Sequence, residues 1–345
     1  MTPDLISLLS RKYKAALFLA LSCQIAVLSN GQASAVAQDG QVGKGDKLAQ
    51  ASVSTAPTGD FSFDDDKSHE TERKEVEEFL NNLETMWNRH DIDGVMGNYA
   101  DDYVNNDGID KNTVRKLTSE FWKTYPDAHS SSATKNIRID GLYATVDSRD
   151  QATGTTANEF QSIKSKGELQ SLSEGRLYLK KVSGHWKIIG DRIDFEKVKV
   201  SFGLAKQLKA SFTAPEQIRS GKQFTARLDV SLPPGLNAVG SIANQPLKYP
   251  QVAASDNPRV FEAGSSLERV MNANNENCNE LLTARILLTS PTRDKVLGVS
   301  VFTRRLNVVP EPRPESVIGE ATVKADPVKT DSVKADPPKA ENEQK

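Results

Sequence analysis

The side chains of this sequence that could exchange protons are carboxylates and imidazoles in one central stretch. They are Asp102, Asp107, His129, Asp147, His185 and Asp191, and the tyrosines Tyr99, Tyr103 and Tyr125 could donate hydrogen bonds beside them. A carboxyl group or an imidazole can act as an acid or a base near neutral pH when burial moves its pKa into that range. Proton transfer would therefore need one of these groups to face a cavity.

Three of these side chains are the catalytic candidates: His129, Asp102 and Asp107. His129 comes before three serines at the expected start of a strand. His185 stands at a hairpin turn, where exposure is expected. A solvated turn is the competing interpretation for Asp102, because it follows a short helix.

Six aromatic residues could line a ligand pocket near these candidates. They are Trp87, Tyr99, Tyr103, Phe121, Trp122 and Tyr125. Their helical spacing is equally that of an ordinary hydrophobic core, so core packing is the competing interpretation.

Other chemistries have little support in the sequence. The four histidines lie far apart, and the segment 91–94 lacks the remaining oxygen ligands of a calcium loop, so we expect no metal. A nucleophile elbow, a phosphate loop and a dinucleotide fingerprint are absent, and we expect no cofactor. Lysine and arginine total 44 against 46 acidic residues, which argues against a nucleic-acid partner.

The amino end has the layout of a secretory signal peptide. A basic patch at residues 11–14 precedes an apolar run at 15–28, and two overlapping A-x-A cleavage choices follow at 33–37. The competing interpretations are an uncleaved anchor and a lipoprotein at Cys23. We expect an exported protein, periplasmic or extracellular, that meets a membrane only through this segment before cleavage. Cleavage would leave Cys278 alone, without an internal disulfide.

Three stretches before Pro126 have the apolar spacing of amphipathic helices. The first carries Val76, Phe79, Leu80, Leu83, Met86 and Trp87 at three- and four-residue steps. Asp91 can cap a second, short helix, and Asn112 or Thr113 can cap a third that Pro126 ends. The sequence predicts three helices in succession.

After Pro126 the apolar period becomes that of strands. Alternation covers residues 137–139, 142–149, 168–182 and 185–200, with glycine turns between them. Helices followed by an antiparallel meander predict an α+β layer with the helices on one face of a sheet.

A second β region runs from about Leu208 to Pro310. Its short strands, separated by proline and glycine, predict a sandwich of immunoglobulin-like type. Within it, the segment 267–279 is rich in Asn and Glu, and we expect a loop with one short helix there.

Two further segments are too polar to bury a core. One follows the signal, and the other is a tail that repeats Val-Lys-Ala-Asp-Pro and predicts an extended spacer. The expected organisation is a signal peptide at 1–37, a disordered linker at 38–69, an α+β domain at 70–203, a β-sandwich at 204–310 and a disordered tail at 311–345.

Three motifs follow one another in the α+β region: FLNNLETMWNRHDIDGVM at 79–96, YADDYV at 99–104 and GHWKIIGD at 184–191. Together they resemble SnoaL-like proteins, a branch of the nuclear-transport-factor-2-like superfamily, over about residues 70–203. The resemblance implies a cone with a cavity between its long helix and a concave sheet. Family members use the cavity as an isomerase, dehydratase, cyclase or hydrolase site, or as a binding or dimerisation surface, so the fold leaves the function open.

Two functions follow as hypotheses. The first is an exported ligand-binding or protein-interaction module of the cell envelope, whose ligand would be a small hydrophobic molecule. The alternative is an isomerase, dehydratase or cyclase with a buried acid or base in the cone. A homodimer is a further hypothesis, in which the apolar surface would come from Leu177, Leu179, Val182, Trp186, Ile188 and Ile193.

Overall fold

The computed structural model of the chain describes residues 69–249, 258–261 and 266–311. The predicted signal peptide, the predicted linker up to residue 68 and the predicted tail from residue 312 lie outside these described residues.

Three helices open the described chain: α2 (Glu70–Asn88), α3 (Ile92–Gly97) and α4 (Lys111–Thr124). The Asp91 side chain accepts a hydrogen bond from the backbone N–H of Gly94 and caps α3 as predicted. The cap predicted for α4 was wrong by a few residues. Asp110 takes that place, because its extended backbone lets the carboxylate accept from the Thr113 N–H at 2.8 Å.

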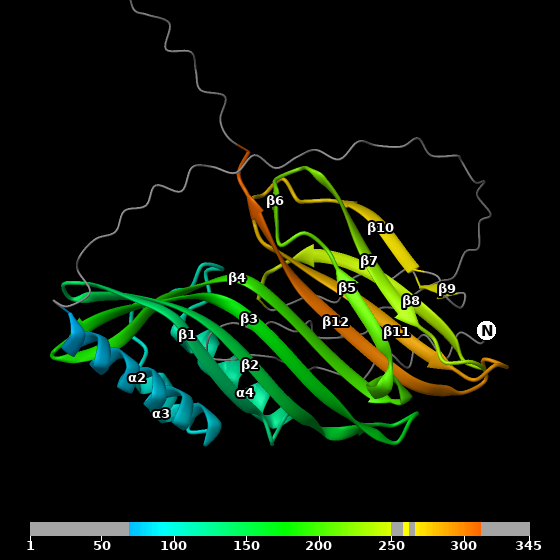
Figure 1. Cartoon of the computed structure of the whole chain (residues 1–345), viewed down its shortest axis with the longest axis horizontal. Helices are drawn as coiled ribbons and strands as arrows, with labels where there is room; N and C mark the ends of the chain where they lie inside the picture. Colours follow the sequence, from blue (N-terminus) through cyan, green and yellow to red (C-terminus); the bar gives the residue numbers. More distant parts are fainter. Residues whose placement is uncertain (1–68, 250–257, 262–265, 312–345) are drawn as a thin grey trace, which may run out of the picture. The chain divides into compact units, whose positions relative to one another are not determined.

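Four long strands follow in an antiparallel meander: β1 (His129–Asp140), β2 (Tyr143–Phe160), β3 (Ser165–Val182) and β4 (His185–Gly203). In Figure 1 the helices lie on one face of these strands, with α2 beside β1 and α4 beside β2. Residues from both layers form one hydrophobic core. The predicted α+β layer is confirmed for this region.

The second β region adds the 3₁₀ helix η1 (Leu204–Gln207) and eight strands. They are β5 (Lys209–Thr213), β6 (Gln217–Arg219), β7 (Gln223–Ser231), β8 (Asn237–Pro246), β9 (Arg259–Phe261), β10 (Ser266–Asn272), β11 (Glu280–Thr289) and β12 (Val296–Val309). One sheet runs in the order β1-β2-β3-β4-β12-β11-β8-β9, with β6 paired to β12 outside this path, and a smaller sheet runs β10-β7-β5.

An immunoglobulin-like sandwich in a domain of its own is not confirmed. β12 pairs with β4 from Gly298 opposite Gly203 to Arg304 opposite Lys197, so one sheet continues across the predicted boundary at residue 203. Residues of the smaller sheet and of β8, β11 and β12 share a second hydrophobic core. The second region is therefore two-layered, but one of its layers extends the sheet of the cone.

The loop with a helix predicted for 267–279 was wrong in its first part. Residues 266–272 form β10, which pairs antiparallel with β7. The polar composition misled because β10 is an edge strand, and Glu268 faces solvent where it pairs with Arg227 at 3.0 Å. Met271 of the same strand is buried.

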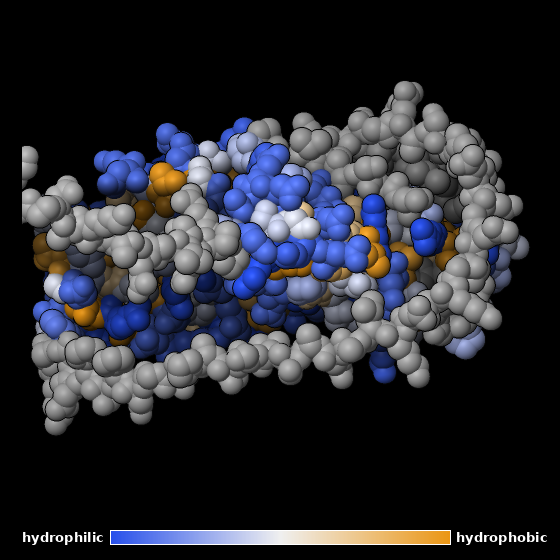
Figure 2. Space-filling model, turned by 90° about the horizontal axis from the view of Figure 1, so that it is seen from above, coloured by the Kyte–Doolittle hydropathy of each residue, from blue (hydrophilic) through white to orange (hydrophobic). Residues whose placement is uncertain are grey.

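The apolar residues predicted as a dimer surface face inward instead. Leu177, Leu179, Trp186, Ile188 and Ile193 are all buried, and only Val182 of the six is exposed. Seen from above in Figure 2, the described surface is mostly hydrophilic, with apolar residues in small separate groups.

Candidate functional site

Two of the three catalytic candidates lie at the surface. His129 is the first residue of β1, and Asp102 lies in the turn after α3; both are exposed. A catalytic acid or base must be enclosed for its pKa to shift toward neutral pH, because water screens the charges and dipoles around an exposed group. Neither side chain has such an enclosure.

The third candidate, Asp107, is held by an arginine from the far end of the chain. Its carboxylate accepts two hydrogen bonds from the Arg305 guanidinium, both at 2.7 Å. The side chains are only 4% and 1% exposed, so the ion pair is buried. The guanidinium occupies both carboxylate oxygens, so this pair is structural.

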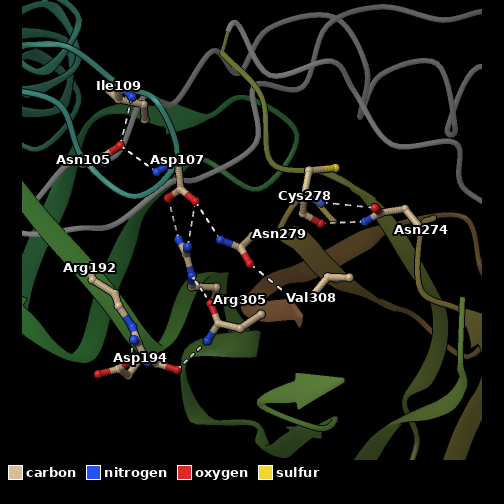
Figure 3. Close-up of polar contacts among 11 residues, drawn as sticks. Asn105, Asp107, Ile109, Arg192, Asp194, Asn274, Cys278, Asn279, Arg305 and Val308 are labelled. Atoms are coloured by element: carbon tan, nitrogen blue, oxygen red, sulfur yellow. Dashed lines mark hydrogen bonds and ion pairs between the residues drawn. The ribbon is translucent and has the colours of Figure 1, made fainter. Parts of the chain in front are cut away.

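The ion pair belongs to a network that joins the loop after α3 to the second β region (Figure 3). Asn279 donates to Asp107 at 2.9 Å and accepts from the Val308 N–H at 3.1 Å. The Asn105 side chain accepts from the N–H groups of Asp107 and Ile109, both at 2.9 Å, which fixes the loop that carries Asp107. The network fastens the cone to β12.

The six predicted pocket aromatics are buried against one another. Trp87, Tyr99, Tyr103, Phe121, Trp122 and Tyr125 are each at most 7% exposed. The ring of Trp87 lies 5.8 Å from that of Phe121 and 5.7 Å from that of Trp122, while Tyr99 and Tyr103 meet edge to face at 4.8 Å. These are core-packing distances. The structure thus brings the six residues together as a packed interior.

One buried carboxylate inside the cone does have the surroundings of an acid or base. Asp191 of β4 is 5% exposed, and its Oδ2 accepts a hydrogen bond from the Tyr103 hydroxyl. Its Oδ1 is buried without a hydrogen-bond partner. The backbone bond from Asn106 N–H to the Asp191 carbonyl, at 3.0 Å, holds the loop that carries Tyr103 against β4.

Burial raises the pKa of Asp191 to about 7. Desolvation is the main cause, and the hydrogen bond from Tyr103 and the charge of Arg305 only partly oppose it. The negative charge of Asp107 adds to the rise. Burial and the Asp191 carboxylate also raise the pKa of Tyr99 and Tyr103, so both phenols stay protonated and can donate hydrogen bonds.

A cavity of about 630 Å³ opens at the other end of β4. Its lining comes from the turn between β2 and β3, the junction of β4 with η1, and the turn between β11 and β12. The lining residues are Phe160, Ser162, Ile163, Ser165, Gly203, Leu204, Leu287, Asp294, Lys295, Val296 and Leu297. Sites for small molecules typically measure about 300 to 1,000 Å³ and are mostly apolar, as this cavity is.

Gly203 allows the three segments around the cavity to meet. Its φ is +58°, and a Cβ there would lie 2.4 Å from the Leu297 carbonyl oxygen and 2.5 Å from the Ile163 side chain. Only glycine combines this backbone conformation with the missing volume. The cavity wall therefore depends on this residue.

The buried acid and the cavity are far apart. Asp191 and Gly203 lie on the same strand, and at about 3.3 Å a residue the strand covers roughly 40 Å between them. A ligand in the cavity does not touch Asp191. The space that could hold a molecule and the group that could move a proton belong to different parts of β4.

In the described part of the chain, no cluster of three or more His, Cys, Asp or Glu side chains has a geometry that could hold a metal ion. Within the same ranges, no helix is long and apolar enough to cross a membrane.

The sequence pattern included Asp191 among the possible acids but missed the cavity. Phe160, Ile163 and Leu204 lie at or beside turns, where a pattern predicts only polar punctuation. The signal that could have found them is the isolated apolar residue Ile163 between the polar residues Ser162 and Lys164.

Comparisons with known proteins find likeness only at the level of structure. No family model matches the chain, and no curated protein matches it. The solved structure of Bd1075 from Bdellovibrio bacteriovorus is 13% identical over 36% of this chain and 41% of that protein, with a TM-score of 0.30. Thus the chain spans under half the length of that protein.

Two smaller proteins are similar over the same share of the chain. Aln2 from a Streptomyces species is 13% identical over 36% of this chain and 90% of its own, with a TM-score of 0.30. The hexachlorocyclohexane dehydrochlorinase LinA-type3 from Novosphingobium barchaimii is 11% identical over 38% and 92%, with a TM-score of 0.29. Likeness at this level carries no conclusion about activity.

Proposed function

We propose that this chain is an exported binding module of the cell envelope that takes a small apolar or amphipathic molecule in the cavity beside Gly203. The observation that carries the proposal is the cavity itself, about 630 Å³ in volume and lined mainly by apolar side chains. Contact with this lining would remove part of a small ligand's apolar surface from water, which is the main source of its affinity.

The composition of the lining favours binding over catalysis. Its titratable side chains are Asp294 and Lys295, and both are exposed at a turn. General acid–base chemistry needs a group whose pKa is tuned by enclosure, and the cavity supplies none among its lining residues. Export and the envelope location rest on the signal-peptide pattern.

The proposal is tested by titrating the purified chain with the neutral fluorescent probe N-phenylnaphthylamine. We expect saturable binding, weakened at least about tenfold by Leu204→Asp, because the substitution places a charge in the apolar lining. Leu204 is 48% exposed, so the variant should still fold.

Leu142→Asp is the matched control. Leu142 is 59% exposed at the turn between β1 and β2, outside the cavity lining, and its replacement should leave the affinity unchanged. Equal affinity of wild type and Leu204→Asp would refute the proposal.

A second candidate function is an isomerase, dehydratase or cyclase activity in the cone, and Asp191 is the observation that favours it. Its carboxyl pKa of about 7 and its hydrogen bond from Tyr103 suit a general acid or base at neutral pH. The packed aromatic rings around it leave this the weaker of the two candidates.

Proton transfer at Asp191 can be tested without knowing the substrate. Cyclic ketones are incubated with the protein in deuterated water, and exchange of their α-protons is followed by NMR. The candidate predicts exchange that Asp191→Asn abolishes and that the exposed-residue control Asp102→Asn retains. Exchange at the uncatalysed rate with wild-type protein eliminates it for these ketones.

A further inference from the structure

The cavity beside Gly203 has two chemically different parts. Its inner wall is formed by apolar side chains. One of them, Phe160, is buried, and its ring lies 5.5 Å from that of Phe202. Its rim carries Ser162, Asp294 and Lys295, all of them exposed. A molecule that fills both parts would have an apolar body and a polar end.

The negative charge at the rim is already engaged. The Asp294 carboxylate accepts hydrogen bonds from the hydroxyls of Ser290, at 2.5 Å, and Thr292. These bonds lower the pKa of Asp294, with a small further contribution from the charge of Lys295. Asp294 therefore belongs to the turn between β11 and β12.

The positive charges at this end of the molecule are not engaged in the same way. In the described ranges, neither Lys295 nor Lys164 makes an ion pair, and Lys164 lies between the lining residues Ile163 and Ser165. The neighbouring Lys206, by contrast, is paired with Glu168 at 2.9 Å. The ammonium of Lys295 thus remains available beside the Asp294 carboxylate, and that of Lys164 remains available in the turn between β2 and β3.

We propose that the cavity selects amphipathic anions, such as alkyl or aryl carboxylates, with the apolar part in the lining and the carboxylate beside Lys295. This inference rests on the proposed binding function and specifies its ligand class. Lys164, whose sequence neighbours Ile163 and Ser165 line the cavity, adds a second, weaker attraction. The apolar contacts supply the affinity, and the rim charges supply the preference for an anion.

The test is displacement of N-phenylnaphthylamine from the full chain at low ionic strength by octanoate, octanol or octylammonium. The three molecules share one alkyl chain and differ in charge. We expect octanoate to displace the probe at about tenfold lower concentration than octanol, and octylammonium to be no better than octanol. The preference should shrink as sodium chloride is added, since exposed charges are screened by salt.

Variants assign the preference to the rim. Lys295→Met should weaken octanoate by about fivefold and leave octanol unchanged, because an exposed ion pair contributes modestly. The double variant with Lys164→Met should remove the remaining preference. Lys180→Met is the matched control: Lys180 lies over the Tyr143 ring, away from the cavity lining, and its loss should change neither ligand.

The outcomes separate the two proposals. If octanol displaces the probe as well as octanoate does, or if the double variant keeps the preference for the anion, the anion proposal is overturned while the binding function stands. If the probe binds wild type and Leu204→Asp equally, the binding function fails, and the ligand class fails with it.

Discussion

Two positions on β4, Asp191 and Gly203 at its end, differ in what they offer to a ligand. At Asp191 the strand borders an interior filled by aromatic rings, with a carboxylate whose pKa is raised to about 7. At Gly203 it borders an open apolar cavity of about 630 Å³ with only exposed charges in its lining. Among the described residues, the region at Asp191 has a carboxylate that could transfer a proton but no cavity for a ligand. The region at Gly203 has a cavity but no buried acid or base in its lining.

This difference explains why the fold of the cone is a poor guide to function here. A cone becomes an active site when its acid or base and its cavity coincide. In this chain the second β region extends the sheet beyond the cone, and the cavity forms where the extension begins. The cavity is thus a product of the added strands.

The largest expected effect concerns the attachment of the cone to the added strands. Arg305→Met leaves the Asp107 carboxylate buried without its partner, and we expect a loss of about 3 to 5 kcal/mol in the free energy of unfolding. Urea unfolding followed by tryptophan fluorescence measures it. A loss near zero would mean that the pair does not fasten the two regions.

Two further variants test whether the buried, unpaired Asp107 charge causes the loss of stability in Arg305→Met. The double variant Asp107→Asn with Arg305→Met removes the stranded charge and should recover much of the stability. Arg227→Met breaks the exposed pair with Asp229 and should cost about 1 kcal/mol or less.

The next effect tests whether the cone interior is dry. Because the pKa of Asp191 is about 7 in the fold and near 3.8 in the unfolded chain, the folded protein holds the proton more tightly. This group's contribution to stability is therefore present below about pH 4 and is lost as the pH rises to 7. Its full loss corresponds to roughly 4 kcal/mol.

Asp191→Asn removes this titration. Between pH 4 and pH 8 we expect the free energy of unfolding of the variant to rise relative to that of wild type by nearly the roughly 4 kcal/mol given above. Urea unfolding at several pH values measures this difference. Asp102→Asn serves as the control, since its side chain is exposed. Parallel curves for wild type and Asp191→Asn would show that water reaches the carboxylate.

The smallest effect concerns the cavity end. Gly203→Ala forces a Cβ to within 2.4 Å of the Leu297 carbonyl oxygen at a positive φ, and we expect a loss of about 1 to 3 kcal/mol together with weaker probe binding. Gly141→Ala is the matched control, because Gly141 also has a positive φ of +56° but open space around it. Unchanged probe binding in Gly203→Ala would show that the probe does not bind in the cavity beside Gly203.

The helices and the meander were predictable because their signals are local. The apolar spacing from Val76 to Trp87 and the alternation of residues 168–182 each report a single buried face. The same applies to Asp91, whose role as a cap depends only on the next few residues.

The pairing of β12 with β4 was not predictable in this way. Nothing in the residues around Gly203 indicates that Gly298 lies opposite, because strand pairing over such a separation leaves no local pattern. For the same reason Asp107 looked like a free acid: its partner Arg305 is far away in the sequence. The buried state of Asp191 likewise depends on Tyr103, from a distant loop.

The position of β12 at the end of the described chain has a consequence for biosynthesis. β4 is complete long before β12 has been made, and until then its outer edge presents unpaired N–H and C=O groups. A nascent or truncated chain that ends near residue 203 would carry this edge exposed, and such edges pair with other chains and aggregate. A stable fragment of this protein must therefore keep β12, even if the cone alone is of interest.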